Sequence, residues 1–246
     1  MTSSIKSIMK ENVRDKTVLV RADLNIPMSN GNISDQSRVE RVIPTINFLK
    51  SSGAKIVICS HLGRPNGKYN KNYTLKPLVE ILSNILETNV RFSNSCLGQE
   101  ALDIKTSLKA GEILLLENVR FHEEETNNSL SFAKKLSEGC DLFVNDAFSC
   151  SHRAHSSLHA ITNFLPSYSG KLMDEEIKAL TSVLSSPIKP VAALVGGAKI
   201  STKINIIEYL MTKMDYLIIG GAMANTFLVA EGSDVGKSLF EKESVN

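Results

Sequence analysis

Short runs of consecutive apolar residues alternate along this chain with segments of helical periodicity, and this alternation narrows the possible folds more than any other feature. Strand patterns occupy residues 18–24, 54–60, 112–118, 141–145, 191–195 and 216–220. Helical spacing follows the first run at Val39, Val42, Ile46 and Leu49. Wholly apolar strands that alternate with helices are typical of a parallel sheet covered on both faces. The sequence therefore predicts an α/β fold with three layers, α/β/α.

A boundary is expected near residues 185–191, where two prolines interrupt the pattern. The helix predicted just before it, over 172–185, has three acidic residues near its start and would connect two Rossmann-like lobes. We expect a first domain over 1–170, a connecting helix and hinge over 171–188, and a second domain beginning over 189–246. Only two strand–helix units follow the hinge, so the second lobe is expected to be incomplete.

Charge and cysteine usage exclude several classes of protein. A net charge of +2 without a run of like charges does not indicate a basic surface for nucleic acid. No apolar span of membrane-crossing length and no signal peptide are evident, so we expect no membrane partner. The four cysteines have no CxxC spacing and are expected to be reduced thiols in a cytoplasmic protein.

Polar residues cluster directly after the predicted strands. In an open parallel sheet, ligands bind outside the carboxyl ends of the strands. All eight arginines lie at or before Arg153, and four of them follow strands: Arg38, Arg64, Arg120 and Arg153. The planar arginine fork suits phosphate and carboxylate. The sequence therefore predicts an anion-binding site in the first domain.

Residues 143–157, FVNDAFSCSHRAHSS, contain several chemically active side chains close together. Cys150, His152 and His155 would supply three ligands for zinc, but Arg153 lies among them and would repel the cation. A cysteine–histidine nucleophile pair is also conceivable, although nothing in the sequence indicates an acyl substrate. Positive charge held at a strand end is the explanation we prefer, and no metal ligands are assigned.

The second half contains LVGGAKISTK at 194–203, a strand followed by Gly196 and Gly197 and then by Lys199 and Lys203. We expect a helix to carry both lysines, which at a spacing of four residues would lie on one face near its N-terminus. A second strand–Gly-Gly turn follows at 218–228. The Walker A pattern is absent, yet glycines, lysines and a helix N-terminus together favour binding of nucleotide phosphates.

Six motifs, in order along the whole chain, resemble phosphoglycerate kinase. They are VRADLNIPM with SDQSR, SHLGRP, LLLENVRFHEEE, VNDAFSCSHRAHSS, GGAKISTKI and GGAMANTFLVAEGSDVGKSL. The resemblance implies a monomer of two lobes. The N-terminal lobe would bind 3-phosphoglycerate or 1,3-bisphosphoglycerate, and the C-terminal lobe would bind ATP or ADP with its Mg²⁺.

The resemblance also assigns individual residues. The substrate side would comprise Asp23, Asn25, Arg38, His61, Leu62, Gly63, Arg64, Arg120 and Arg153. Asp23 and Asn25 would bind the hydroxyl and carboxyl end. Arg38 and Lys199 would be catalytic, the first beside the transferred phosphoryl group and the second stabilising it. Lys203, Gly196 and Gly197 would contact the nucleotide.

The implied reaction moves a phosphoryl group reversibly between a carboxylate and ADP. A carboxylate is already ionised at neutral pH, so no general base is required. Positioning and charge neutralisation then suffice, together with closure of the lobes that excludes water.

Length is the main departure from the family. Relatives continue beyond residue 246, and that part supplies the aspartate for magnesium and most of the adenosine pocket. We therefore expect a kinase sequence with little turnover as it stands. The alternative is a non-catalytic phosphoglycerate-binding module. A dehydrogenase is disfavoured because no GxGxxG follows the first strand.

Overall fold

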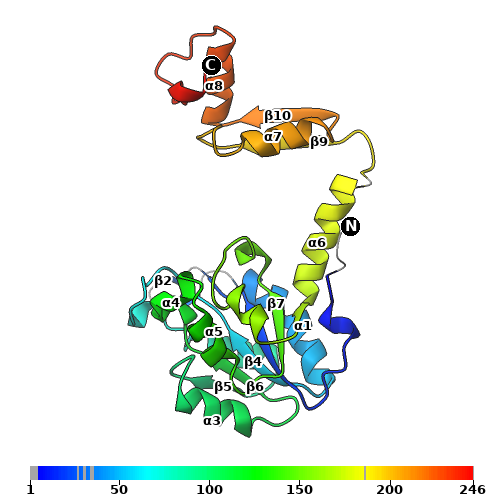
Figure 1. Ribbon diagram of the computed structural model, residues 1–246, viewed down its shortest axis with the longest axis vertical. Coiled ribbons are helices and arrows are strands. Elements are labelled where there is room, and N and C mark those ends of the chain that lie inside the picture. The colour runs from blue at the N-terminus through cyan, green and yellow to red at the C-terminus, as the bar shows by residue number, and fades with distance from the viewer. Residues whose placement is uncertain (1–4, 27, 30–31, 34–35, 186, 246) are drawn as a thin grey trace. The chain divides into compact units, whose positions relative to one another are not determined.

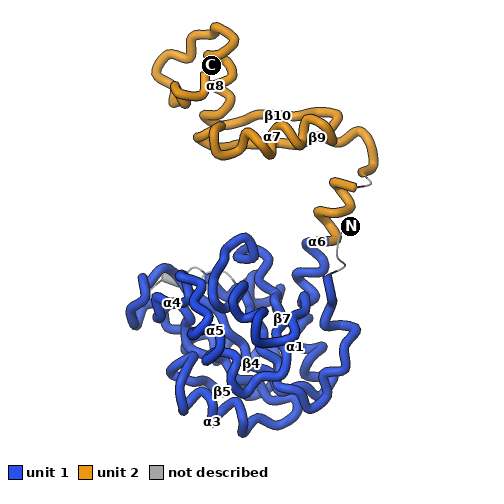
Figure 2. Tube along the Cα trace, in the orientation of Figure 1, with its two compact units in different colours: residues 1–177 blue, residues 178–246 orange. Residues whose placement is uncertain are grey.

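The computed structural model describes residues 5–26, 28–29, 32–33, 36–185 and 187–245. Pro27, Ser34 and Asp35, which belong to the first of the motifs quoted above, lie outside the described residues. The chain divides into two compact units, Met1–Ile177 and Lys178–Asn246 (Figure 2). None of the helices in the described residues is both long and apolar enough to span a membrane.

The first unit is built on a six-stranded sheet (Figure 1). Its strands are β1 Thr17–Ala22, β4 Lys55–Cys59, β5 Val90–Ser93, β6 Ile113–Leu116, β7 Leu142–Asp146 and β8 Ser167–Ser169. The order across the sheet is β5-β6-β4-β1-β7-β8, and every neighbouring pair is parallel. The predicted α/β fold with a parallel sheet is confirmed. Two short segments, β2 Met28–Ser29 and β3 Asn32–Ile33, form a separate antiparallel pair.

Alternate residues of each strand pack on opposite faces of this sheet. In β1, Val18 and Val20 belong to one apolar cluster, and Leu19 belongs to another. The first cluster includes buried residues of α1 Ser37–Ser51 and α2 Leu78–Ile85, and the second includes those of α3 Gln99–Ser107 and α5 Leu130–Ser137. Helices therefore cover both faces, which makes the three layers.

Helix α1 continues through Pro44, a residue that usually interrupts a helix. The proline is exposed, whereas Val42, Ile46 and Leu49 are buried against the sheet. Proline inside a helix costs about 3 kcal/mol, and each fully buried aliphatic side chain contributes roughly 1.5–3 kcal/mol. Packing of the apolar face therefore outweighs the local penalty.

The remaining short elements of this unit are mostly single turns. They are η1 Ile8–Lys10, η2 Lys71–Tyr73, η3 Val119–Phe121, α4 Glu123–Thr126, η4 Phe148–Cys150 and η5 Ala160–Asn163. Three of them, η3, α4 and η4, follow β6 and β7 and bring polar residues to the carboxyl edge of the sheet.

Helix α6, Lys171–Ser185, begins beside the carboxyl end of β7. A side-chain oxygen of Asp146 accepts a hydrogen bond from the Met173 amide at 3.0 Å. Burial raises the pKa of Asp146 to about 6, and its other oxygen has no hydrogen-bond partner among the described residues. Gly170 fits here because a Cβ would lie 2.3 Å from the Asp146 carboxyl.

The second unit contains a parallel pair of strands, β9 Ala192–Gly196 and β10 Tyr216–Gly220, with helices α7 Ile204–Met211 and α8 Ala222–Ala230 and the turn η6 Lys242–Ser244. Ile200, Ile207 and Met223 form its buried core. Leu194 and Ile218 are partners in register, and they are 73% and 53% exposed. One face of this strand pair is therefore apolar and open to solvent.

The predicted placement of both lysines on one helix was wrong. Helix α7 begins at Ile204, so Lys203 is its N-cap residue and Lys199 lies in the preceding loop. The Lys203 amide donates to the Ile200 carbonyl at 2.7 Å, which closes a turn before the helix begins. Burial of Ile200 in the core of the second unit holds that turn in place.

Candidate functional site

The four central strands bring the predicted site residues to one edge of the sheet. Strands β6, β4, β1 and β7 are adjacent and parallel, so the segments that follow them lie side by side. A cavity of about 310 Å³ opens there, lined by Asp23, Asn25, Arg38, His61, Gly63, Arg64, Arg120, Ser149, Cys150 and Arg153. The predicted convergence of four arginines is therefore observed. What they bind stays a prediction.

The segment after β1 supplies the acidic and amide groups of this cavity. Arg38, in the first turn of α1, donates through Nη1 to an Asp23 carboxylate oxygen at 2.5 Å. The Ser149 hydroxyl donates to the same Asp23 oxygen at 2.5 Å. Asn25 Oδ1 accepts from the Gly63 amide at 2.8 Å, which ties this segment to the loop after β4.

The loop after β4 requires glycine at its centre. Gly63 has φ +61°, and a Cβ there would lie 2.4 Å from the Tyr73 ring. The Gly63 carbonyl accepts from Arg120 Nη1 at 2.8 Å. Leu62 differs from its neighbours, since its side chain packs into the core and is absent from the cavity wall. If Leu62 contributes to binding, it does so through its backbone.

A second cavity, of about 280 Å³, shares three of these arginines. It is lined by Arg64, Asn66, Gly67, Arg120, Thr126, Arg153 and His155. Burial lowers the pKa of Arg120, and the charges of Arg153 and Arg21 lower it further. Its Nε is buried without a hydrogen-bond partner among the described residues. A bound anion would relieve this repulsion and provide acceptors for unpaired donors.

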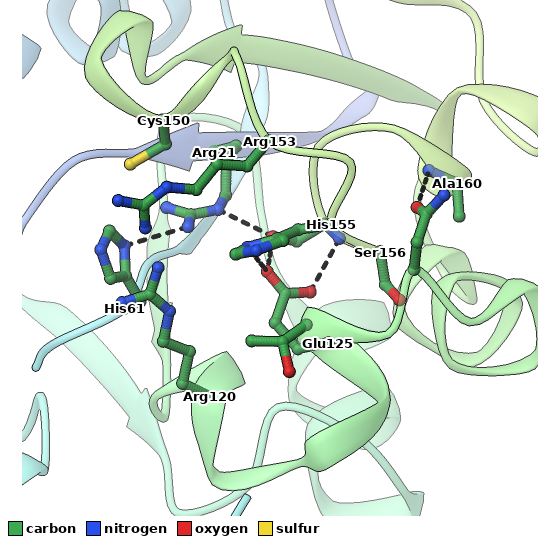
Figure 3. Close-up of polar contacts among 12 residues, drawn as sticks. Arg21, His61, Arg120, Glu125, Cys150, Arg153, His155, Ser156 and Ala160 are labelled. Carbon is green, nitrogen blue, oxygen red and sulfur yellow. Dashed lines mark hydrogen bonds and ion pairs between the residues drawn. The ribbon is translucent and has the colours of Figure 1, made fainter. Parts of the chain in front are cut away.

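His61 is neutral at this site. Burial lowers its pKa to about 2, and the nearby charges of Arg21, Arg120 and Arg153 act in the same direction. Its Nδ1 lies 3.1 Å from Arg21 Nη2 (Figure 3). The pKa of His155 is lowered too. Burial is the largest cause, and the charge of Glu125 opposes it. Positive charge in these cavities therefore comes from arginine and not from histidine.

Arg21 is a site residue that sequence reasoning missed. It lies within β1, is fully buried, and contacts both His61 and Ser157. Ser157 in turn donates its hydroxyl to Glu125, which is also fully buried. The available signal was a charged residue inside an otherwise apolar strand, since buried charges need partners.

The described residues gather three candidate metal-ligand side chains in one place only, at Asp23, His61 and Cys150. Within segment 143–157, His152 is exposed and is not part of that group. Asp23 is already paired with Arg38, and Arg21 contacts His61 Nδ1. Arginine charges surround the remaining donors, so this donor set suits an anion better than a cation.

In the second unit, the strand ends and glycines form a separate polar loop. Lys203 Nζ donates to the Gly196 carbonyl at 2.8 Å, while Lys199 is exposed. Gly221 has φ +69°, and a Cβ there would lie 2.9 Å from the Gly197 carbonyl oxygen. The two Gly-Gly turns thus approach each other closely, which requires glycine at this position.

Similarity to known proteins extends over nearly the whole chain. The family model described as phosphoglycerate kinase matches residues 8–246. The chain is 48% identical over 231 residues to a phosphoglycerate kinase of Methylorubrum extorquens, covering 94% of this chain and 58% of that protein. It is 47% identical over 244 residues to one of Borrelia garinii subsp. bavariensis, covering 99% of this chain and 62% of that protein.

Solved structures give the same result. Phosphoglycerate kinase from Coxiella burnetii superimposes with a TM-score of 0.86 at 41% identity, covering 98% of this chain and 61% of that one. The enzyme from Pyrococcus horikoshii gives a TM-score of 0.81 at 36% identity, covering 94% and 59%. The chain thus spans about three fifths of the length of its relatives. By sequence over residues 8–246 and by fold, it belongs to the phosphoglycerate kinase family.

Proposed function

We propose that the first unit binds 3-phosphoglycerate, or its acyl phosphate 1,3-bisphosphoglycerate, in the arginine-lined cavity. The observation that carries this proposal is the meeting of Arg38, Arg64, Arg120 and Arg153 around about 310 Å³. A small molecule with a carboxylate at one end and a phosphate at the other matches such a wall of bidentate donors.

The polar groups of the cavity divide into two sets. Asp23 and Asn25 provide acceptor oxygens beside Arg38, which suits the hydroxyl and carboxyl end of the substrate. Arg64, Arg120 and Arg153 line both cavities, which suits the phosphate. His61 and the Gly63 backbone complete the wall. Arg38 is then the arginine beside the carboxyl group that gains or loses the phosphoryl group.

The proposed reaction is the reversible transfer of a phosphoryl group between 1,3-bisphosphoglycerate and ADP, which gives 3-phosphoglycerate and ATP. The accepting carboxylate needs no deprotonation, so the protein has to position the reactants and neutralise oxyanions. Arg38 supplies positive charge at the acyl phosphate, and Lys199 supplies it to the phosphoryl group during transfer. The proposal includes a monomeric, cytoplasmic enzyme.

The second unit fits the phosphates of a nucleotide. Lys203, Gly196 and Gly197 surround a strand end where small residues allow close approach of an anion. Mg²⁺ would neutralise charge on those phosphates when it is bound. The described residues of this unit bring no three candidate metal ligands together, so we assign the ion no ligands and no step.

A coupled assay on purified residues 1–246 tests the catalytic part of the proposal. Because the described residues of the second unit bring no three candidate metal ligands together, we expect turnover far below that of a full-length relative. Any phosphoryl transfer that Lys199→Ala abolishes would be intrinsic to this chain. Turnover equal to that of a full-length relative would show that residues 1–246 already hold the metal and nucleotide.

A non-catalytic phosphoglycerate-binding module is the second candidate. It is favoured by one observation: the complete set of cavity arginines belongs to the first unit. Binding of 3-phosphoglycerate with no turnover at saturating ATP and Mg²⁺ would identify this chain as such a module. Measurable turnover that depends on Lys199 would exclude it.

A further inference from the structure

A buried polar network lies behind the cavity and connects four separate segments of the first unit: β1, the loop after β4, helix α4 and the segment after β7. Its centre is the guanidinium of Arg21, which is 0% exposed. Nε donates to the Ser157 hydroxyl at 2.8 Å, and Nη1 donates to the Ala22 carbonyl at 2.6 Å. Nη2 lies 3.1 Å from His61 Nδ1 (Figure 3). Each of the three nitrogens of this guanidinium therefore has a protein partner.

The contact with Arg21 determines where His61 carries its proton. A guanidinium has only N–H donors and no acceptor, so His61 Nδ1 must accept and must be unprotonated. The neutral ring then has its proton on Nε2. His61 lines the arginine-lined cavity. With Nδ1 occupied by Arg21, Nε2–H is the polar group of the ring that remains for a ligand in that cavity. A ring free to exchange tautomers would present an acceptor part of the time, which would repel an anion.

Glu125 determines how Ser157 meets Arg21. The Ser157 hydroxyl donates to Glu125 Oε1 at 2.6 Å, and the Ser157 amide donates to Oε2 at 2.8 Å. With its proton directed at Glu125, the Ser157 oxygen is left to accept from Arg21 Nε. Glu125 and Ser157 are each 0% exposed, so this carboxylate also supplies buried negative charge close to the Arg21 cation.

We infer that Arg21 and Glu125 are positioning residues for substrate binding: through Ser157 they hold the guanidinium in one plane, and the guanidinium keeps His61 as the Nε2–H tautomer facing the anion. The inference rests on the proposed binding of 3-phosphoglycerate. Neither residue touches the substrate in this arrangement, since neither lines the cavity. Their effect is exerted through the proton position on His61.

Histidine ring NMR on the full chain tests the tautomer directly. Long-range proton–nitrogen spectra distinguish protonated from unprotonated ring nitrogens, and His61→Asn identifies its signals among the five histidines. The expected result is an unprotonated Nδ1 and a protonated Nε2, unchanged between pH 8 and pH 5. A proton on Nδ1, or titration of His61 in that interval, would overturn the inference.

Glu125→Gln tests the remote end of the network. Both Ser157 groups donate to Glu125, and a glutamine amide can accept from only one of them while its NH₂ opposes the other. We expect mixed tautomers of His61 and affinity for 3-phosphoglycerate weakened about tenfold, the effect of one hydrogen bond of roughly 1.4 kcal/mol. The matched control is Glu124→Gln, the same change on an exposed residue of the same helix, which should alter neither.

Each outcome decides the question. Unchanged tautomer and affinity in a folded Glu125→Gln protein would remove Glu125 from the network's function. If that variant does not fold, Arg21→Lys replaces it, because an ammonium lacks the planar fork and should release His61 into mixed tautomers. A wild-type chain that fails to bind 3-phosphoglycerate would refute the proposed function, whereas the tautomer of His61 would still be measured independently.

Discussion

Replacing Arg153 with alanine should weaken binding of 3-phosphoglycerate without unfolding the first unit. Arg153 lines both cavities, and its side-chain hydrogen bond to His152 is a long one, from Nε to Nε2 at 3.4 Å. Among the described residues, no carboxylate forms an ion pair with it. Its removal therefore breaks no strong internal contact. The loss should fall on the anion.

The expected magnitude follows from the charge-assisted hydrogen bonds that the guanidinium can form with a phosphate. Each is worth roughly 1.5–3 kcal/mol, and 1.4 kcal/mol is a factor of about ten in affinity. Loss of one such bond therefore predicts about 10- to 100-fold weaker binding. The free energy of unfolding should change by about 0.5 kcal/mol or less, as for a surface substitution.

Isothermal titration calorimetry on residues 1–246 measures this effect. Arg91→Ala is a matched control. Arg91 lies in β5, donates a hydrogen bond to Ser107, and lines neither cavity. The control should bind as the wild type does. Unchanged affinity in Arg153→Ala, or an equal loss in Arg91→Ala, would refute the assignment of the phosphate to this wall.

Two further changes test other parts of the structure. Burial raises the pKa of Asp146 to about 6 from an ordinary 3.8, so its contribution to stability is present below pH 3.8 and is lost as the pH rises through 6. Asp146→Asn should accordingly gain free energy of unfolding relative to wild type, by up to about 3 kcal/mol, between pH 4 and pH 8 in urea titrations; a difference that does not vary with pH would contradict this. Ile218→Lys should reduce dye binding and light scattering by the chain, because Ile218 lies on the open apolar face of β10. Scattering equal to that of wild type would show that this face does not drive association.

The arrangement of the cavity was largely predictable because the parallel order of the strands determines which residues lie together. Once four apolar strands are expected in one sheet, residues just past their carboxyl ends must meet at one edge. Asp23, His61 and Arg120 are neighbours for that reason, although they are far apart in sequence. Leu62, in the same SHLGRP motif, packs its side chain into the core, and the motif alone did not indicate that orientation.

Features that depend on register or on tertiary packing were not predictable. Arg21 and Glu125 meet through Ser157, and that contact requires β1, α4 and the segment after β7 to be placed within about an ångström. Strands β5 and β8 are short and partly polar, so their patterns are weak. Lys203 was expected inside a helix. Ile200 is instead buried in the core before the helix starts, and the helix begins at Ile204.

The central claim is that the arginine-lined cavity of the first unit is the binding site for 3-phosphoglycerate. Backbone amide NMR of residues 1–246 during titration with this ligand tests it most directly. Saturable shifts should concentrate in the loops that carry His61, Arg64 and Arg153, while β9 and β10 remain unperturbed. A folded chain whose spectrum does not respond, or responds only in the second unit, would contradict the claim.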